Sequence, residues 1–344
     1  MNRPPNSAGE RIRPAKAEHP ADIPLPPAPE EMPVPAMPVP APASPLDLRL
    51  LRVLDGGMAT ELERHGCDIS GPLWSAHVLD STPEIVRRVH LDYLRAGADC
   101  ISTVSYQVSR LGYAELGRPA SDAALALRKS VDIARSAVEE YRAESDRPIF
   151  IAASLGPYGA ALHNGAEFHG RYDISFEDLV RFHAERLAVI AETTADLVAL
   201  ETVPSLEEAE AISRALEQFP SIAAWISFTC KDAHRVAHGE PLAECAALLQ
   251  RVPGVVAVGV NCTQPKLISS LIREIKPASD KPVFVYPNSG ELWDAGTRSW
   301  YGPSSIQDFA QQAKAWYAAG AQAVGGCCRT TPAHIRAVRE ALHG

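Results

Sequence analysis

The feature that most constrains the fold is an alternation that starts near residue 50 and continues to the C-terminus. Short apolar runs, rich in valine, isoleucine and alanine, alternate with longer segments that carry apolar residues at helical spacing, as in 83–98, 121–143 and 176–193. Apolar strands buried on both faces and followed by helices are typical of a parallel sheet. The eight runs are LRVLD (51–55), DCISTVSY (99–106), PIFIAASLG (148–156), DLVALET (196–202), AAWISFTC (223–230), VVAVGVNCT (255–263), PVFVYPNSG (282–290) and AQAVGGCC (321–328).

This alternation predicts a single α/β domain over residues 48–344. Eight strand–helix units in roughly 295 residues match a closed (β/α)8 barrel, the TIM barrel. Periodicity cannot show closure, so a doubly wound open sheet remains the alternative. In a barrel, the carboxyl ends of all strands face one mouth, where active sites are built.

Residues 1–47 are expected to form a disordered, proline-rich tail. Residues 1–45 hold 14 of the chain's 29 prolines, in repeats such as MPVPAMPVPAPASP. Proline fixes φ and has no amide hydrogen to donate, so such a segment favours polyproline II over helix or sheet. The tail is either a solvated segment without a part in catalysis or a docking site for a proline-binding module. Its acidic residues argue against a transit peptide.

Composition excludes two classes of partner. The net charge of −9 and the lack of an Arg/Lys run argue against a nucleic-acid surface. No stretch of about 18 apolar residues predicts a membrane span, and no hydrophobic signal core follows the basic start. The seven cysteines lack the spacing of a disulfide scaffold, which favours a reducing compartment, the cytoplasm, and leaves thiols for metal binding or catalysis.

Polar and thiol side chains stand at the ends of the predicted strands, where a barrel would bring them to one mouth. Those ends read Asp55-Gly56-Gly57, Ser105-Tyr106-Gln107, Glu201-Thr202, Asn261-Cys262-Thr263, Asn288-Ser289-Gly290 and Gly325-Gly326-Cys327-Cys328.

Three of the cysteines predict a metal site. Cys327 and Cys328 are adjacent, and Cys262 ends a strand that lies near theirs around the barrel. Three thiolates with one open position are the donor set of a catalytic zinc site, since structural zinc sites are usually closed by four protein ligands. A vicinal disulfide and ordinary buried thiols remain alternatives. Gly325 and Gly326 are expected to let the backbone turn so that both neighbouring thiols reach the metal.

The other four cysteines, Cys67, Cys100, Cys230 and Cys245, are expected to be core or surface thiols, although Cys230 also ends a strand. A Zn²⁺ ion with three thiolates carries a formal charge of about −1 and is a poor Lewis acid for water. It suits the binding of a substrate thiol as a nucleophilic thiolate. The site therefore predicts alkyl transfer to sulfur, with one zinc ion per chain and no catalytic side chain beyond the metal ligands.

Two carboxylates at strand ends are candidates for binding a substrate ammonium group. Asp55 and Glu201 would face the same mouth as the thiols, although each could equally be a turn or capping residue. The backbone amides of Gly56 and Gly57 are candidates for the substrate carboxylate, and Asn261 for a further substrate contact.

Two aromatic residues, Trp74 and Tyr106, are either core residues or contacts to the substrate. The glycine-rich loop over residues 156–170 contains His163 and His169, which we expect to be surface or lid residues. No regular spacing relates these two histidines to the cysteines.

The motifs resemble those of the zinc-dependent homocysteine S-methyltransferases, in the branch that uses S-methylmethionine or S-adenosylmethionine as methyl donor. The similarity covers about residues 50–343. It implies a (β/α)8 barrel in which Cys262, Cys327 and Cys328 bind zinc, homocysteine sulfur fills the fourth position, and Asp55 and Glu201 hold the homocysteine amino group. The motifs are LDGGMATELERHGCDISGPLWSA (54–76), DYLRAGADCISTVSYQ (92–107), ASLGPYGA (153–160), GVNCT (259–263) and GGCCRTTP (325–332).

Two departures narrow the implied donor. The related betaine-using enzymes carry a tyrosine directly after the glutamate and a long C-terminal dimerisation extension. Here the residue is Thr202, and only 16 residues follow Cys328. The resemblance thus implies methyl transfer from a sulfonium donor to homocysteine, giving methionine, by a monomer or small homo-oligomer. A homocysteine-activating module of a cobalamin system and a zinc- or redox-sensing binding protein remain the alternatives.

Overall fold

The computed structural model describes residues 46–69, 77–294, 299–302 and 304–343. Residues 1–45 of the predicted tail lie outside the described residues, and so does Trp74. The first described helix is the 3-10 turn η2 (Leu48–Leu50), and the boundary near residue 48 stays a prediction.

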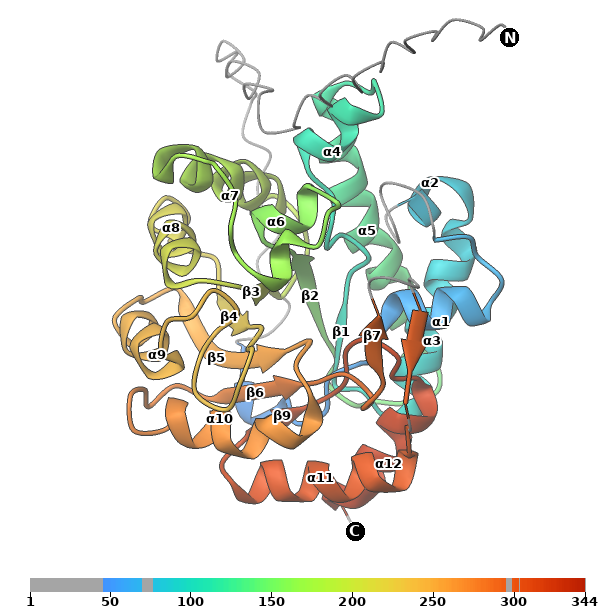
Figure 1. Ribbon diagram of the computed structural model, residues 1–344. Coiled ribbons are helices and arrows are strands. Elements are labelled where there is room, and N and C mark those ends of the chain that lie inside the picture. Colours follow the sequence, from blue (N-terminus) through green and yellow to red (C-terminus); the bar gives the residue numbers. More distant parts are fainter. Residues whose placement is uncertain (1–45, 70–76, 295–298, 303, 344) are drawn as a thin grey trace, which may run out of the picture.

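A curled, seven-stranded parallel sheet forms the centre of the protein (Figure 1). Its strands are neighbours in the same order as in the chain, which is the simplest result of repeated strand–helix units. Seven of the eight predicted runs contain one of these strands. They are β1 (Cys100–Ser102), β2 (Phe150–Leu155), β3 (Leu197–Val203), β4 (Ala224–Phe228), β5 (Val255–Asn261), β6 (Val283–Tyr286) and β9 (Ala323–Val324).

The first predicted run forms two isolated bridges instead of a named strand. Val53 pairs in parallel with Val324, and Leu54 pairs in parallel with Cys100. Both edge strands of the sheet, β9 and β1, therefore pair with this one segment. A side chain supports the same segment: the Asp99 carboxylate accepts from the backbone N–H of Arg52 and of Val53, at 3.2 and 3.0 Å.

The α-helices lie around the outside of the sheet and follow one another in chain order from α7 to α12 in Figure 1. Several begin at a serine whose side chain accepts from the amide three residues on, as at Ser175 and Ser205. The helices are α1 (Met58–Arg64), α2 (Val78–Ser81), α3 (Pro83–Ala96), α4 (Arg110–Glu115), α5 (Ala120–Tyr141), α6 (Tyr158–Ala161), α7 (Phe176–Ile190), α8 (Leu206–Leu216), α9 (Leu242–Gln250), α10 (Ile268–Ile275), α11 (Ile306–Ala318) and α12 (Pro332–His343). In the described parts of the chain, no helix has the length and apolar character needed to cross a membrane.

Two apolar clusters hold these layers together. The larger one lies between the sheet and its helices, and the smaller one fills the inside of the curled sheet. Trp225 and Phe284 meet edge to face in the smaller cluster, with ring centroids 5.4 Å apart. Tyr286 joins the same cluster and accepts a hydrogen bond from Trp225 Nε1 at 2.9 Å. These packed side chains occupy the inside of the curled sheet, which leaves the carboxyl ends of its strands as the part of the sheet open to a ligand.

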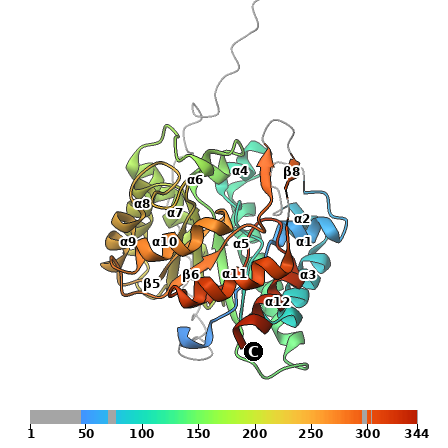
Figure 2. The ribbon, with the colours of Figure 1, turned by 60° about the horizontal axis from the view of Figure 1, so that its bottom comes forward.

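Two insertions after strand ends extend that mouth. The short helix α6 follows β2, and an antiparallel hairpin of β7 (Leu292–Asp294) and β8 (Ser299–Tyr301) follows β6. Both lie on the upper side of the molecule in Figure 2. The hairpin is absent from the alternation pattern, which extends the seventh run to residue 290, whereas β6 ends at Tyr286.

Candidate metal centre

The three predicted thiols converge at the carboxyl ends of β5 and β9. The sulfur atoms of Cys262, Cys327 and Cys328 all lie within 4.8 Å of one another, and the thiols are half-buried and unbonded to other sulfurs. Cys262 Sγ and Cys328 Sγ are 3.7 Å apart. A tetrahedral ion with zinc–sulfur bonds of about 2.3 Å would hold its sulfurs about 3.8 Å apart, so this donor set fits zinc in both chemistry and spacing.

The backbone around Cys327 is held by neighbouring loops. Its amide donates to Pro287 O at 2.8 Å, and its carbonyl accepts from Thr330 Oγ1 at 2.7 Å. The Gly326 amide donates to Asp55 O at 3.0 Å. The cysteine pair therefore has its position set from three sides before any metal binds.

The reason for the two glycines differs from the prediction. Neither Gly325 nor Gly326 has a positive φ, and the left-handed residue of this turn is Arg329, with a φ of 66°. A Cβ atom on Gly325 would lie 2.5 Å from the Leu54 Cβ, and one on Gly326 would lie 2.3 Å from Thr330 Oγ1. Close packing therefore requires these glycines, and the predicted turn is made after Cys328.

Asp55 is buried beside this centre. Its carboxylate accepts from the Ser102 backbone N–H at 2.6 Å and from Ser102 Oγ at 3.2 Å. Burial is the main cause that raises the pKa of Asp55 to about 8, and the negative charge of Glu201 contributes to this rise. Glu201 therefore lies close enough for its charge to act on Asp55.

Glu201 lies at an irregularity in β3. The β3–β4 register shifts between Leu200 and Val203, so one extra residue is accommodated there, as in a β-bulge. Burial raises the pKa of Glu201 to about 7, with a second contribution from Cys327, and Ser154 Oγ donates to its Oε1.

Thr202 takes the strained conformation within this irregularity, with a φ of 61°. Asn261 stabilises it from β5. The Thr202 amide donates to Asn261 Oδ1, and Asn261 Nδ2 donates to Thr202 Oγ1, both at 2.8 Å. Asn261 is almost fully buried. The structure thus places Asn261 in a positioning role next to Cys262, and its predicted contact with substrate stays a prediction.

Tyr106 also reaches the centre. Its ring packs over Gly156, where a Cβ atom would lie 2.8 Å from the ring. Burial raises the pKa of Tyr106, and the charges of Glu167 and Cys262 add to this rise. The Gly57 amide, in contrast, already donates to Thr330 Oγ1 at 3.0 Å.

Comparison with known proteins identifies the family. The profile of the homocysteine S-methyltransferase family matches residues 52–342. The chain belongs to the homocysteine S-methyltransferase family. It is therefore an enzyme, a methyltransferase, as the sequence motifs predicted. Among similar proteins, homocysteine S-methyltransferase YbgG of Bacillus subtilis is 45% identical over 299 residues, which are 85% of this chain and 95% of the relative.

Two further relatives extend this comparison. Crystal structures of the homocysteine methyltransferase MmuM from Escherichia coli in oxidised and metallated forms are each 41% identical, with TM-scores of 0.78 and 0.77. They cover 85% and 84% of this chain and 96% of the MmuM chain. Selenocysteine Se-methyltransferase from Brassica oleracea var. italica is 43% identical over 305 residues, covering 84% of this chain and 88% of the relative.

Within this homocysteine S-methyltransferase, the remaining cysteines stay outside the cluster. Cys100, Cys230 and Cys245 are buried and Cys67 is half-buried, and among the described residues none joins the three clustered sulfurs. Cys230, which also ends a strand, lies near the cluster without joining it. Its amide donates to Oγ1 of Thr263, the residue after Cys262, at 3.0 Å.

Sequence reasoning missed several side chains of this methyltransferase site. Ser102 interacts with the carboxylate of Asp55, and Ser154 and Tyr286 interact with that of Glu201. Glu167 lies in the loop over residues 156–170, and its charge acts on Cys328. His169 is exposed, as predicted. Position at a strand end was a usable signal for Ser154, which sits one residue before the end of β2.

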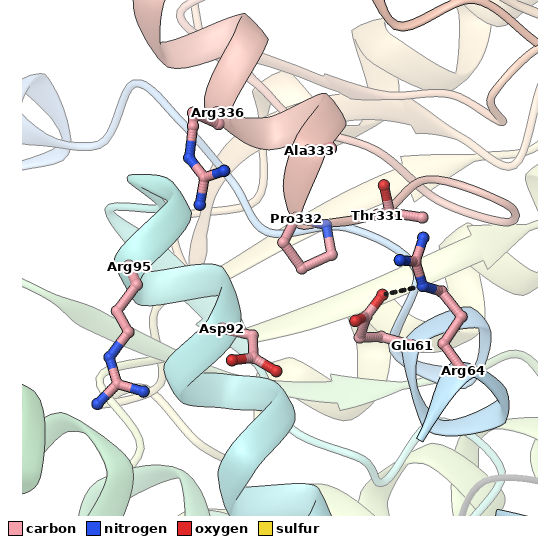
Figure 3. A pocket seen from close by; sticks show the side chains of 8 residues that line it. All are labelled: Glu61, Arg64, Asp92, Arg95, Thr331, Pro332, Ala333 and Arg336. Carbon is pink, nitrogen blue, oxygen red and sulfur yellow. Dashed lines mark ion pairs between the residues drawn. The ribbon is translucent and has the colours of Figure 1, made fainter. Parts of the chain in front are cut away.

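One cavity of this methyltransferase lies away from the thiols, between α1, α3 and α12 (Figure 3). Charges of both signs line it and pair with each other, as in the 3.4 Å contact between Arg64 and Glu61. Asp92 pairs with His65 at 2.9 Å. Ion pairs therefore line this cavity, and no cysteine is among the residues that line it.

Proposed function

We propose that this enzyme transfers a methyl group from a sulfonium donor to the thiolate of homocysteine, giving methionine. The observation that carries the proposal is the convergence of Cys262, Cys327 and Cys328, with sulfurs within 4.8 Å, beside two buried carboxylates. In the transfer, the new bond forms between homocysteine sulfur and the methyl carbon. The old sulfur–methyl bond breaks with its electron pair, so that the donor leaves as a neutral thioether.

Zinc fits the three thiols, and we propose one ion per chain held by Cys262, Cys327 and Cys328. When bound, zinc supplies a site at which a substrate thiol loses its proton and stays nucleophilic as a thiolate. The metallated form of MmuM, a relative of known structure, supports the assignment of a metal to this centre.

The two carboxylates bind and orient the acceptor. Asp55 and Glu201 are buried acids, burial disfavours the ionised form of each, and a substrate ammonium would offset that cost. The substrate carboxylate is left to the Gly56 amide, because the Gly57 amide already donates to Thr330. Tyr106 lies over the same site, where its ring face can receive the donor cation. Trp74, the other aromatic candidate for this contact, is retained as a prediction.

The charges around the thiols favour a cationic donor. The acids Glu201 and Glu167 act on Cys327 and Cys328 respectively. Thiolates and carboxylates together make the mouth strongly negative, so it would attract a sulfonium ion and repel an anionic folate. Thr202 stands where a betaine enzyme would have tyrosine, which favours S-methylmethionine or S-adenosylmethionine over betaine.

We further propose that the domain over residues 48–344 is a closed (β/α)8 barrel with the segment at Val53 and Leu54 as its first strand. The bridges of this segment to both β9 and β1 support closure. Residues 1–47 form a separate tail. The enzyme works in the cytoplasm on small-molecule substrates, as a monomer or small homo-oligomer.

A second acceptor deserves testing because one relative, 43% identical, is named for the methylation of selenocysteine. A selenol is more acidic than a thiol and would meet the same three cysteines as a selenolate. We propose that the enzyme also methylates selenocysteine.

The test is an assay of the isolated, zinc-loaded protein. Initial rates of methionine formation from homocysteine are compared with S-methylmethionine, S-adenosylmethionine, betaine and methyl-folate at equal concentration, and the best donor is then tried with selenocysteine. We expect S-methylmethionine to be fastest. Turnover only in the presence of a cobalamin protein, or none with any donor, would overturn the proposal in favour of the module or sensor alternatives.

A further inference from the structure

Glu167 is a half-buried acid that the acceptor site does not use. It lies in the 3-10 turn η4 (Ala166–Phe168), in the loop between β2 and α7. Its Oε2 atom has almost no exposed surface, and it accepts no hydrogen bond from the part of the chain that the structure describes. A buried carboxylate oxygen without a donor is costly, and natural structures keep few of them.

The charge of Glu167 acts on residues of the metal centre. It acts on Tyr106, which packs beside the thiols, and on Cys328 itself. The acceptor acid Glu201 acts on Tyr106 as well, and also on Asp55. Glu167 therefore adds a second negative charge to the site, carried by the loop after β2 and not by the strand β3 that holds Glu201.

The loop that carries Glu167 is firmly built. Gly159 in α6 receives its backbone so closely that a Cβ atom there would lie 2.4 Å from the Glu167 amide. On one side the Tyr158 amide donates to Glu208 Oε1 at 2.6 Å, and on the other Tyr172 OH donates to Glu208 Oε2.

Glu208 is itself held in place by α7. Fully buried in α8, it pairs with His183 Nε2 at 3.0 Å. Arg186 NH2 lies 3.0 Å from the other ring nitrogen of His183, and Arg186 NH1 donates to Gly156 O at 2.8 Å. This network ties both ends of the loop to two helices. These hydrogen bonds hold the loop that carries Glu167 in place.

We infer that Glu167 is the anionic group that receives the positive charge of the methyl donor. The inference rests on the proposed function and names the donor side of the same site. A sulfonium cation entering toward the thiols would supply the missing electrostatic partner of Glu167, with the ring of Tyr106 on its flank. Burial raises the pKa of Glu167 to about 7, as expected for a carboxyl group that lacks a cationic partner.

The experiment measures donor binding without turnover. Calorimetry on the zinc-loaded enzyme, without homocysteine, compares S-methylmethionine with methionine, which has the same skeleton but no sulfonium charge. We expect Glu167→Gln to weaken S-methylmethionine binding about tenfold to a hundredfold, the usual range for a charge-assisted contact. Methionine binding, homocysteine binding and zinc content should stay unchanged.

Two further variants complete the design. Glu167→Asp retains the charge and should recover part of the lost affinity, and Glu177→Gln, which neutralises an exposed acid in α7, should behave like the wild type. Equal losses for S-methylmethionine and methionine would mean that Glu167 only shapes the loop, and an unchanged S-methylmethionine affinity would likewise overturn the inference. If wild-type enzyme turns over no sulfonium at all, it is the proposed function that fails.

Discussion

Cys262 and Cys328 are 66 positions apart in the chain, yet their sulfur atoms lie 3.7 Å from each other. The relationship follows from the sheet. Cys262 comes directly after β5, and Cys328 follows β9, with β6 as the one strand between them. In a parallel sheet both carboxyl ends lie at the same edge, so side chains placed there by distant segments meet.

Removing any one of the three thiols should remove the metal. Cys262→Ala, Cys327→Ala and Cys328→Ala each delete one of three protein ligands, so we expect loss of activity and substoichiometric zinc in all three. Cys245→Ala, at a buried position outside the cluster, is the control that keeps its zinc. Metal analysis of the purified variants is decisive, and near-stoichiometric zinc in the three site variants would contradict the assignment.

Neutralising the acceptor carboxylates should weaken homocysteine binding while sparing zinc. Asp55→Asn and Glu201→Gln preserve shape but remove a negative partner of the substrate ammonium, a contact worth about 1.5–3 kcal/mol. The measurement is calorimetric titration of each zinc-loaded variant with homocysteine. Unchanged affinity in both variants would show that these acids have another role.

The burial of Asp55 also predicts how stability depends on pH. The pKa of Asp55 is about 8 in the folded protein against an ordinary value of 3.8, so the folded state keeps a proton that the unfolded chain has released. The folded state binds more protons across that window, and its stability therefore falls as pH rises from about 4 to 8.

Asp55→Asn should make that fall shallower, because the amide never ionises. The melting temperature of reduced, metal-free protein is measured at several pH values for the wild type, Asp55→Asn and the exposed control Asp173→Asn. Parallel curves for all three proteins would argue against the raised pKa of Asp55.

Asn261→Ala should change the position of Glu201 through its neighbour Thr202. The variant removes both hydrogen bonds that hold Thr202 at its positive φ, at a cost of about 1–3 kcal/mol in the free energy of unfolding. We expect weaker homocysteine binding with zinc retained. Gln250→Ala is the matched control, since the side chain of Gln250 also takes part in two hydrogen bonds but lies before β5, at the opposite end of the sheet. The prediction fails if both variants lose stability equally and bind homocysteine normally.

Deleting residues 1–45 should leave kcat and KM within about twofold, because a proline-rich polar segment contributes little to a packed domain. Steady-state kinetics and melting temperature of the truncated and full-length proteins test this. Loss of folding or turnover would assign the tail a structural role.

The sequence by itself determined the α/β architecture and the three thiols, because both depend on patterns that are local in the chain. Apolar runs at strand length and amphipathic segments at helical spacing reflect burial directly. Residues that end such runs can be assigned to one edge of the sheet without coordinates, which was enough to bring Cys262 together with Cys327 and Cys328.

Only the tertiary structure decided what each of the other side chains contacts. The need for Gly325 comes from Leu54, the conformation of Thr202 from Asn261, and the position of Glu167 from a loop held by Glu208. None of these pairs has a spacing that repeats, so no periodic signal marks them. They arise from long-range contacts that form only when the sheet curls and its strand ends come within a few ångströms of one another.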